Sequence, residues 1–336
     1  MRIVTAAGGT GGHIFPAIAL AAELKRMGHT ILFMGGLKGN EGENAKNAGF
    51  DFIGVDVIGF DRSNVINLVK AFAKLPLAVL KAGSALSTFS PHAVVGAGGY
   101  ASGPACLSAA MKRIPLFLLE QNVYPGLVTR KLAKKARRVY TSFGESSRWL
   151  KGADVLYAGN PARPEFTFTH RRYDPAARRK ILIFGGSQGA HSINQAVIDA
   201  MPMLAKLGID FIHQTGERDF MEIKEAYKKQ IPGADVRPFF ENMADMMKNA
   251  DFAVCRAGAS TCAELSLTGL PALLVPYPGA GGHQMLNAKA MESAGAAEVI
   301  KDGELSGGTL FEKIKAIATD VEKLSRMSAN AREAAK

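Results

Sequence analysis

Short apolar runs alternate along the chain with longer segments in which apolar residues recur every three or four positions. The short runs predict buried strands and the longer segments predict amphipathic helices. The predicted strands are Ile3–Ala6, Thr30–Met34, Phe52–Val55, Ala93–Gly96, Leu116–Leu119, Arg138–Thr141, Lys180–Phe184, Asp210–Gln214, Asp235–Pro238, Phe252–Cys255 and Ala272–Val275. The predicted helices include Pro16–Met27, Gly126–Ala136, Ser192–Leu207, Asp219–Gln230 and Thr261–Leu267. Such alternation builds right-handed βαβ units, so the pattern predicts an α/β fold with Rossmann-like, doubly wound parallel sheets.

The alternation is broken once, by the Gly- and Pro-rich stretch Ala158–Pro164. A chain of 336 residues also exceeds the usual size of a single core. We therefore expect two domains, residues 1–160 and 161–336, with the last helix able to pack back on the first domain. Ligands of open parallel sheets bind beyond the carboxyl ends of the strands, and we expect those ends to face each other across a cleft.

Two glycine-rich turns share one setting, after a strand and before a helix. They are Gly8–His13 and Gly185–Ala190, and a third cluster of glycines lies at Gly96–Tyr100. Glycines permit sharp turns and close approach to backbone amides, and a helix N-terminus adds partial positive charge. The turns therefore predict a site for an anion such as diphosphate, although tight strand-to-helix connections alone would also use these glycines. His13 stands at the lip of the first turn, where proton transfer is possible.

These turns do not fit the common dinucleotide or P-loop patterns. Ile14 stands where GxGxxG requires its last glycine, and Gly35-Gly36 stands where an acidic residue would hold an adenosine ribose. No Gly-Lys-Ser or Gly-Lys-Thr occurs. A nicotinamide enzyme is disfavoured.

Two later segments carry polar groups beside glycines. Cys255–Glu264 follows a strand and opens a helix, with Ser260 or Thr261 as a helix cap and Glu264 expected in the first turn. That carboxylate would either complement the helix dipole or accept hydrogen bonds from a vicinal diol such as a ribose. The segment Pro276–Asn287 ends in imidazole and amide groups, which suit a hydroxyl-rich ligand or satisfy the backbone of the loop.

The net charge of +11 is unevenly placed. Residues 1–160 carry 19 Lys and Arg against 9 Asp and Glu, whereas residues 161–336 carry 22 against 21. A basic surface confined to one half predicts an anionic partner, such as a phosphorylated substrate or an acidic lipid surface. We do not expect nucleic acid as the partner, because no aromatic stacking pattern or reader motif accompanies the charge.

Several other function classes lack support. The three cysteines have no CxxC spacing, and no cluster of His, Cys, Asp or Glu has the spacing of metal ligands, so we expect reduced thiols, no metal and no cofactor. No secretory leader precedes the first strand, and no uncharged apolar run approaches about 18 residues. The sequence predicts a cytoplasmic protein.

Taken together, the motifs resemble those of the lipid-linked N-acetylglucosaminyltransferases of peptidoglycan synthesis. The matching segments are Gly8–His13, Gly96–Pro104, Glu120–Asn122, Gly159–Arg163, Gly185–Ala190, Cys255–Glu264 and His283–Ala288. The resemblance implies the GT-B architecture, with acceptor and membrane binding in the first domain and the donor held by the second. It implies transfer of N-acetylglucosamine from UDP-GlcNAc to the 4-hydroxyl of a muramyl-pentapeptide on undecaprenyl diphosphate, with inversion.

The resemblance also implies roles for single residues. Thr10, Gly11 and Gly12 would approach the donor sugar and diphosphate, and Asn122 would contact the sugar. Arg163 and Ser187 would serve the diphosphate, and the backbone of Phe240 would read uracil. Glu264 would hold the ribose, beside Ala259, Ser260 and Thr261 of the matched turn, while His283 and Gln284 would contact the donor sugar. Many members of the family carry two amides at the last pair, so His283 departs from the pattern.

His13 matches the position proposed in that family as the base that deprotonates the acceptor. An inverting displacement needs one base on the attacking side and stabilised negative charge on the leaving side. A histidine titrates near neutrality and suits the first task. Alternatively, its imidazole only bonds the backbone of the loop.

Two basic segments predict peripheral binding to an anionic membrane surface. Val65–Leu86 mixes apolar residues with Lys70, Lys74 and Lys81, and Arg130–Arg138 is densely basic. We expect the protein at the cytoplasmic face of the inner membrane, although an ordinary core helix and a solvated charged helix would share these compositions.

Three rival functions remain open from the sequence. They are a GT-B-fold UDP-GlcNAc 2-epimerase, a transferase that acts on another lipid, and a non-enzymatic nucleotide-sugar-binding protein. An epimerase would need further acid and base groups near the glycine turns, where the sequence offers few beyond His13 and Glu264.

Overall fold

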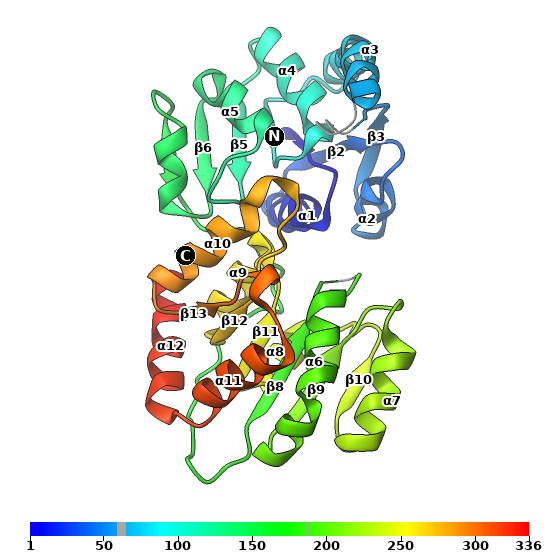
Figure 1. Ribbon diagram of the computed structural model, residues 1–336. Coiled ribbons are helices and arrows are strands. Elements are labelled where there is room, and N and C mark those ends of the chain that lie inside the picture. The colour runs from blue at the N-terminus through cyan, green and yellow to red at the C-terminus, as the bar shows by residue number, and fades with distance from the viewer. Residues whose placement is uncertain (59–64, 187, 336) are drawn as a thin grey trace. The chain divides into compact units, whose positions relative to one another are not determined.

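The computed structural model describes residues 1–58, 65–186 and 188–335 of the chain. The chain divides into two compact units, Met1–Pro164 and Glu165–Lys336 (Figure 1). Each unit is a parallel sheet with helices packed on it.

The first unit holds a seven-stranded sheet. Its strands are β1 (Arg2–Ala6), β2 (Thr30–Gly36), β3 (Asp51–Val55), β4 (Ala93–Gly96), β5 (Leu116–Glu120), β6 (Arg138–Thr141) and β7 (Val155–Tyr157). Its α-helices are α1 (Gly11–Arg26), α2 (Glu41–Asn47), α3 (Val65–Phe89), α4 (Gly103–Met111) and α5 (Leu127–Leu132), with short 3₁₀ helices η1 (Tyr100–Ser102), η2 (Ala133–Lys135) and η3 (Gly144–Trp149).

The second unit holds a six-stranded sheet. Its strands are β8 (Lys180–Phe184), β9 (Asp210–Gln214), β10 (Asp235–Arg237), β11 (Phe252–Cys255), β12 (Ala272–Leu274) and β13 (Ala297–Val299). Its α-helices are α6 (His191–Leu204), α7 (Phe220–Gln230), α8 (Met243–Asn249), α9 (Ala259–Thr268), α10 (His283–Ser293), α11 (Gly307–Ala318) and α12 (Val321–Ala334), with 3₁₀ helices η4 (Ala205–Leu207), η5 (Ala280–Gly282) and η6 (Asp302–Glu304). Helix α12 packs on α9 and α11 of the same unit.

The two sheets have matching strand orders. The first runs β3-β2-β1-β4-β5-β6-β7 and the second runs β10-β9-β8-β11-β12-β13, with parallel pairing throughout the described ladders. In each unit the order reverses beside its first strand, between β1 and β4 and between β8 and β11. The carboxyl edge at such a reversal is where ligands of doubly wound sheets bind. Each glycine turn singled out in the sequence begins there.

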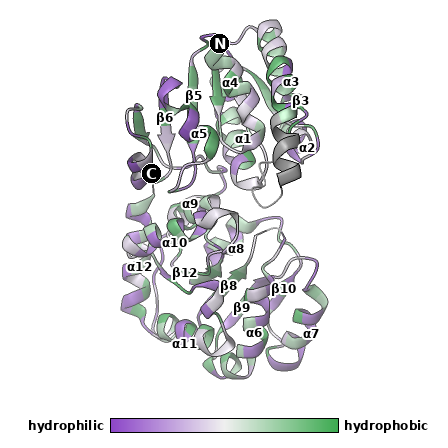
Figure 2. Cartoon of the chain, turned by 45° about the horizontal axis from the view of Figure 1, so that its top comes forward, coloured by the Kyte–Doolittle hydropathy of each residue, from purple (hydrophilic) through white to green (hydrophobic). Residues whose placement is uncertain are grey.

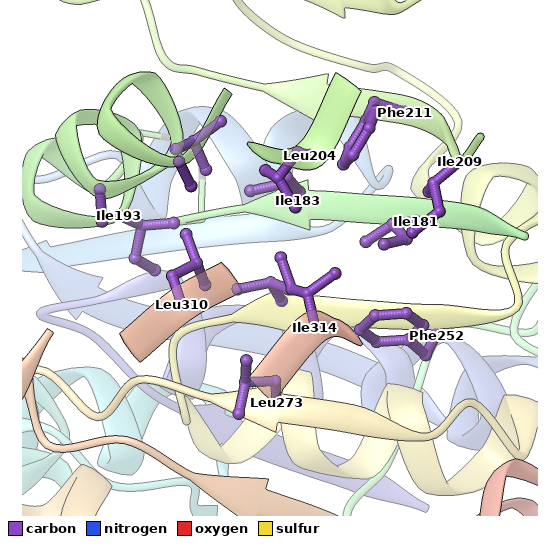
Figure 3. Close-up of a cluster of buried hydrophobic side chains, with 14 of the residues drawn as sticks. Ile181, Ile183, Ile193, Leu204, Ile209, Phe211, Phe252, Leu273, Leu310 and Ile314 are labelled. Atoms are coloured by element: carbon purple, nitrogen blue, oxygen red, sulfur yellow. The ribbon is translucent and has the colours of Figure 1, made fainter. Parts of the chain in front are cut away.

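Both sheets are buried on two faces. In β1, Val4 and Ala6 belong to a core cluster with α3 and α4, whereas Ile3 packs with α1 residues on the other face. In the second unit, Ile181 and Ile183 of β8 lie in a cluster with side chains of α6, β9, β11, β12 and α11 (Figure 3). A fully buried Ile or Leu contributes roughly 1.5–3 kcal/mol, so these clusters dominate the stability of each unit.

Helix α3 presents two different faces. Ala78, Ala82 and Leu86 are buried in the core beneath α4, whereas Leu77 and Leu80 are 70% and 69% exposed. Hydropathy coloured along the chain shows α3 as a mixture of apolar and polar positions (Figure 2). Among the described residues, no helix has the length and apolarity that crossing a bilayer demands.

The structure contains every predicted strand and helix and confirms the α/β class with two parallel sheets. The sequence patterns missed the short strands β7 and β13. Each has three residues, fewer than the roughly four to eight that mark a strand in a sequence. In β13 the apolar run is also broken by Glu298 at its centre.

Candidate functional site

The residues proposed from the sequence gather at the carboxyl edge of one sheet or the other. In the first unit, Thr10, Gly11, Gly12 and His13 follow β1, and Asn122 follows β5. In the second unit, Phe240 follows β10, and the α9 and α10 residues follow β11 and β12. Ser187 lies outside the described residues. In each unit, the residues proposed for the site therefore lie at or near the carboxyl edge of that unit's sheet.

The first glycine turn passes directly into α1. Thr10 occupies the N-cap position with an extended backbone, and its side chain makes no capping hydrogen bond. Its carbonyl accepts the backbone N–H groups of His13 and Ile14 at 3.0 and 3.2 Å. Gly11, Gly12 and His13 are therefore the first three residues of the helix, and His13 projects from the first turn.

A buried carboxylate accepts a hydrogen bond from one backbone amide of this turn. Glu41, 1% exposed at the start of α2, accepts the N–H of Gly9 through Oε1 at 2.8 Å. The Gly9 N–H is therefore directed to Glu41. A carboxylate fixed behind the turn also opposes the partial charge of the helix N-terminus, which reduces the attraction of this turn for a diphosphate.

His13 is held by a residue that the sequence patterns did not single out. Its Nδ1 lies 3.0 Å from Oε1 of Gln121, which follows β5 directly and is only 1% exposed. Because an amide oxygen can only accept, Nδ1–H donates and the imidazole keeps its other nitrogen, Nε2, without a proton when the ring is neutral.

The third glycine cluster makes room for the first. A Cβ on Gly99 would stand 1.6 Å from the carbonyl oxygen of Gly8, and one on Gly98 would stand 2.8 Å from Nδ1 of His13. Both glycines have positive φ, 81° and 73° for Gly98 and Gly99 respectively. The two turns at the reversal of the sheet therefore interlock, and the His13 ring packs against glycine backbone.

Asn122 sits in a loop fixed by a second buried carboxylate. Glu120, 2% exposed, accepts the N–H of Asn122 at 3.0 Å and that of Gly126 at 2.8 Å. The carbonyl of Asn122 accepts the Ser146 hydroxyl at 3.0 Å. The backbone of Asn122 is thus held on both sides.

The side chain of Arg163 lies near the beginning of α1. Its guanidinium lies 5.9 Å from the ring centroid of Phe15, a residue two positions after His13. The structure therefore gathers Arg163 and His13 at the same end of the first unit, although 150 positions separate them in the sequence.

In the second unit, one amide side chain connects two predicted ligand-binding segments. Gln214, at the end of β9 and 2% exposed, accepts the N–H of Phe240 at 2.9 Å and donates to the carbonyl of Gly186 at 3.0 Å. The N–H of Phe240 is therefore engaged inside the protein.

Gln284 also serves the backbone. Its Oε1 accepts the N–H of Ala257 at 3.1 Å and that of Tyr277 at 3.0 Å, and Asn287 donates to the carbonyl of Ala257 at 3.2 Å. Of the two roles left open by the sequence, the Gln284 oxygen fills the structural one. His283 begins α10 beside it.

Helix α9 starts earlier than its Ser and Thr residues suggested. Its N-cap is Gly258, and no side chain caps it, so the capping roles predicted for Ser260 and Thr261 are wrong. Ala259, Ser260 and Thr261 form the first turn, because Gly258 with φ −62° and ψ 146° already supplies the extended cap. Glu264 is the sixth helical residue and lies beyond the first turn, which weakens the interpretation that it only complements the helix dipole.

Charged side chains connect the loops after β8, β11 and β13. Arg256 donates to Asp302, to the Ser192 hydroxyl at 2.8 Å and to the Val275 carbonyl at 3.1 Å. Burial would raise the pKa of Asp302, but hydrogen bonds from Ser192 and Arg256 outweigh it and lower that pKa. The network fixes the beginning of α6 against the neighbouring loops.

A second network lies under α6. His213, fully buried, has a pKa lowered to about 3 by burial, and its Nε2–H donates to Asn194 at 3.0 Å. Asn194 donates to Asp219 at 2.8 Å, and Asp219 also contacts His191, the first residue of α6, at 3.0 Å. Burial would raise the pKa of Asp219, but these two partners lower it.

A search of the described residues finds no group of three or more His, Cys, Asp or Glu side chains placed to hold a metal ion. The three cysteines are buried and form no disulfide. The side chains proposed from the sequence at the two edges include the imidazoles of His13 and His283 and the carboxylate of Glu264, beside helix N-termini, amides and Arg163.

Two doubly wound parallel sheets with glycine turns at their carboxyl edges define the fold class, the GT-B architecture. The N-terminal domain of glycosyltransferase family 28 matches residues 3–141, and the family's C-terminal domain matches residues 180–336. The chain therefore belongs to glycosyltransferase family 28.

Curated relatives match along nearly the whole chain. A UDP-N-acetylglucosamine–N-acetylmuramyl-(pentapeptide) pyrophosphoryl-undecaprenol N-acetylglucosamine transferase from Anaeromyxobacter sp. (strain Fw109-5) is 40% identical, covering 98% of this chain and 88% of the relative. The protein of the same name from Halothermothrix orenii is 37% identical, covering 100% and 95%. The crystal structure of MurG from Acinetobacter baumannii superposes with a TM-score of 0.80 at 27% identity, covering 100% of this chain and 95% of that one.

Proposed function

We propose that the chain transfers N-acetylglucosamine from UDP-GlcNAc to the 4-hydroxyl of N-acetylmuramyl-pentapeptide carried on undecaprenyl diphosphate, with inversion at the anomeric carbon. The names of its relatives describe this pair of substrates, and the similarity extends through both units. The observation that carries the proposal is the gathering of the motif residues at two carboxyl edges, with His13 fixed at one of them.

The second unit is proposed to hold the donor. Its carboxyl edge offers the N-terminus of α6, a 14-residue helix, after the second glycine turn. The described part of this turn receives the amide side chain of Gln214, whereas Asp219 and Asp302 contact the first two residues of α6. Amide groups at a helix N-terminus would stabilise the negative charge of the departing diphosphate. Glu264, beyond the first turn of α9, would accept hydrogen bonds from the ribose hydroxyls.

His13 in the first unit is proposed as the general base. As the 4-hydroxyl oxygen bonds to the anomeric carbon, the bond from that carbon to the UDP oxygen breaks. The hydroxyl proton passes to Nε2 of His13, and the bond electrons leave with UDP. A base so placed contributes about 10²–10⁴ to the rate.

The first unit is also proposed to dock on an anionic membrane surface. On α3, Leu77 and Leu80 are exposed beside exposed Lys81, and Met111, 69% exposed, ends α4 next to exposed Lys112. This arrangement of apolar side chains with cations suits the headgroup boundary of a bilayer. Residues 65–72 of the segment predicted from the sequence lie outside the residues whose side chains are described. The second basic segment, Arg130–Arg138, runs from the end of α5 through η2 to the first residue of β6, and its cations are mostly solvent-exposed.

Membrane docking is tested by flotation with vesicles that do or do not contain anionic lipid, at low and high salt. The pair of substitutions Leu77→Ser and Leu80→Ser should reduce binding, whereas Met221→Ser, at a position 68% exposed on α7, serves as the matched control. Binding indifferent to anionic lipid and to both α3 substitutions would contradict the docking proposal.

The reaction is tested by incubating the purified chain with radiolabelled UDP-GlcNAc and a lipid-linked muramyl-pentapeptide. The expected products are UDP and a lipid-linked disaccharide, formed only when both substrates are present. Conversion of UDP-GlcNAc alone to its 2-epimer would instead support the epimerase, and UDP-GlcNAc binding without turnover would support a binding protein.

A further inference from the structure

The surroundings of His13 suggest what makes this side chain a base. One nitrogen of its ring is taken by a buried partner, Gln121, and the ring packs against Gly98 and Gly99. Gln121 directly follows β5, 108 positions away in the chain, so the contact depends on the packing of β1, β4 and β5 in one sheet.

We propose that Gln121 is a positioning residue that selects the tautomer of His13. Its carbonyl oxygen accepts the Nδ1–H of His13, which keeps Nε2 free of a proton and ready to accept one. This inference rests on the proposed function, in which His13 is the general base. A merely structural contact would not depend on which atom of the amide faces the ring.

The burial of Gln121 makes the selection effective. At 1% exposure its side chain cannot exchange the imidazole for water, and a lost hydrogen bond there would not be replaced. Its Nε2 has no hydrogen-bond partner in the described structure. With the amide reversed, that NH2 group would donate to Nδ1, the ring proton would move to Nε2, and the ring could not accept the acceptor's proton there.

The other ionisable groups near this ring are already committed elsewhere. Glu41 on α2 accepts the Gly9 N–H, and Glu120 on β5 accepts two loop amides. Burial and the nearby Glu41 raise the pKa of Tyr100, which keeps that phenol neutral. Arg163 faces the ring of Phe15. Gln121 is thus the group that bonds the imidazole directly.

Nitrogen NMR of the full chain, labelled with ¹⁵N-histidine, tests the proposal without any substrate. The chain has seven histidines, and the spectrum of His13→Gln identifies the signals of His13. In the wild type we expect the neutral ring to carry its proton on Nδ1. In Gln121→Met we expect the proton to shift toward Nε2, while the signals of His29 and His92 remain unchanged and report an intact first unit.

Kinetics supply the second readout. Gln121→Met should lower kcat about 10- to 100-fold with little change in KM, since a partner that orients a reactive imidazole has effects of this size in metal sites. Gln121→Glu keeps an acceptor for Nδ1–H and stabilises the protonated ring, so it should restore the tautomer and move the acid limb of the pH–rate profile to higher pH.

The outcomes separate the two proposals. A wild-type ring protonated on Nε2, or a tautomer that Gln121→Met leaves unchanged, would overturn the positioning role whatever the enzyme does. The expected spectra together with full activity in His13→Gln would instead leave the tautomer selection in place and refute His13 as the base.

Discussion

The side-chain oxygen of Gln214 accepts the backbone N–H of Phe240 at 2.9 Å, although the two residues belong to different strand ends. The same side chain donates to Gly186 in the second glycine turn. One buried amide therefore joins the turn proposed for the diphosphate to the backbone proposed for uracil. The two ends of a nucleotide would be held at a set separation, and that separation would be lost with Gln214.

Substitution of Gln214 by Met should consequently weaken donor binding. Met preserves the volume but leaves the Phe240 N–H and the Gly186 carbonyl without their partner. We expect KM for UDP-GlcNAc to rise about 10-fold, equivalent to the ~1.4 kcal/mol of a lost hydrogen bond, with kcat reduced less. Steady-state kinetics measure both, and Gln230→Met, an exposed position at the end of α7, is the control. Equal KM values for the two variants would refute a role of Gln214 in donor binding.

The interlocked glycine turns predict a severe effect of a single methyl group. Gly99→Ala would place a Cβ 1.6 Å from the Gly8 carbonyl oxygen, so the first unit must distort to accept it. We expect a loss of more than about 3 kcal/mol in the free energy of unfolding, measured with urea. The matched control is Gly28→Ala, which also has positive φ, 84°, but meets no atom within 4 Å.

For Gly28→Ala only the backbone cost of about 1–2 kcal/mol applies. The difference between the two glycine variants therefore isolates the clash. Similar losses for both would show that the two turns are not locked together.

Loss of the carboxylate behind the first glycine turn should also be costly. Glu41→Ala removes the partner of the Gly9 N–H and leaves a cavity, so we expect a loss of roughly 2–3 kcal/mol in the free energy of unfolding. Glu43→Ala, on an exposed position of the same helix, should change it by less than about 0.5 kcal/mol. If the two variants were equally stable, the hydrogen bond between Glu41 and Gly9 would not contribute to the stability of the first unit.

His213 makes stability depend on pH. Its pKa is about 3 in the folded protein and returns to about 6.5 on unfolding, so the unfolded state binds more protons between these values. The free energy of unfolding should therefore fall as pH drops below about 6.5, by up to about 1.4 kcal/mol per pH unit from this residue.

Urea unfolding at pH 5 and pH 7 measures the effect. In His213→Gln the pH dependence should become shallower, whereas His170→Gln, at an exposed position, should leave it unchanged. A slope that is the same with and without His213 would contradict its burial in the neutral form.

The sheets were predictable because their information is local. A strand that is buried on both faces has a continuous run of apolar residues. Ile181–Phe184 is such a run in the sequence, and Ile181 and Ile183 lie in the core of the second unit. The glycine turns likewise follow β1, β4 and β8 as expected, since the turn after a parallel strand lies at the carboxyl edge of the sheet. Helix boundaries were less certain, and Gly258 replaced the expected Ser260 or Thr261 as the cap of α9.

The residues that support the site were not predictable, because their partners are distant in the sequence. Gln121 and Glu41 meet His13 and Gly9 across 108 and 32 positions. No periodicity marks such residues, and a Gln or Glu in a loop normally predicts solvent exposure. Two signs were present in the sequence: polar residues directly beside buried strands, at Glu120-Gln121 and His213-Gln214, and the position of Gln121 within the matched segment Glu120–Asn122.

The central claim, that His13 removes the acceptor's proton while the second unit holds the nucleotide, is tested most directly by His13→Ala. Transfer to the lipid-linked acceptor and the affinity for UDP, measured by calorimetry, are compared between variant and wild type. The account predicts a fall in kcat of about 10²–10⁴ with the affinity for UDP changed less than about threefold. Transfer within a few-fold of the wild-type rate, or a parallel collapse of UDP binding, would contradict it.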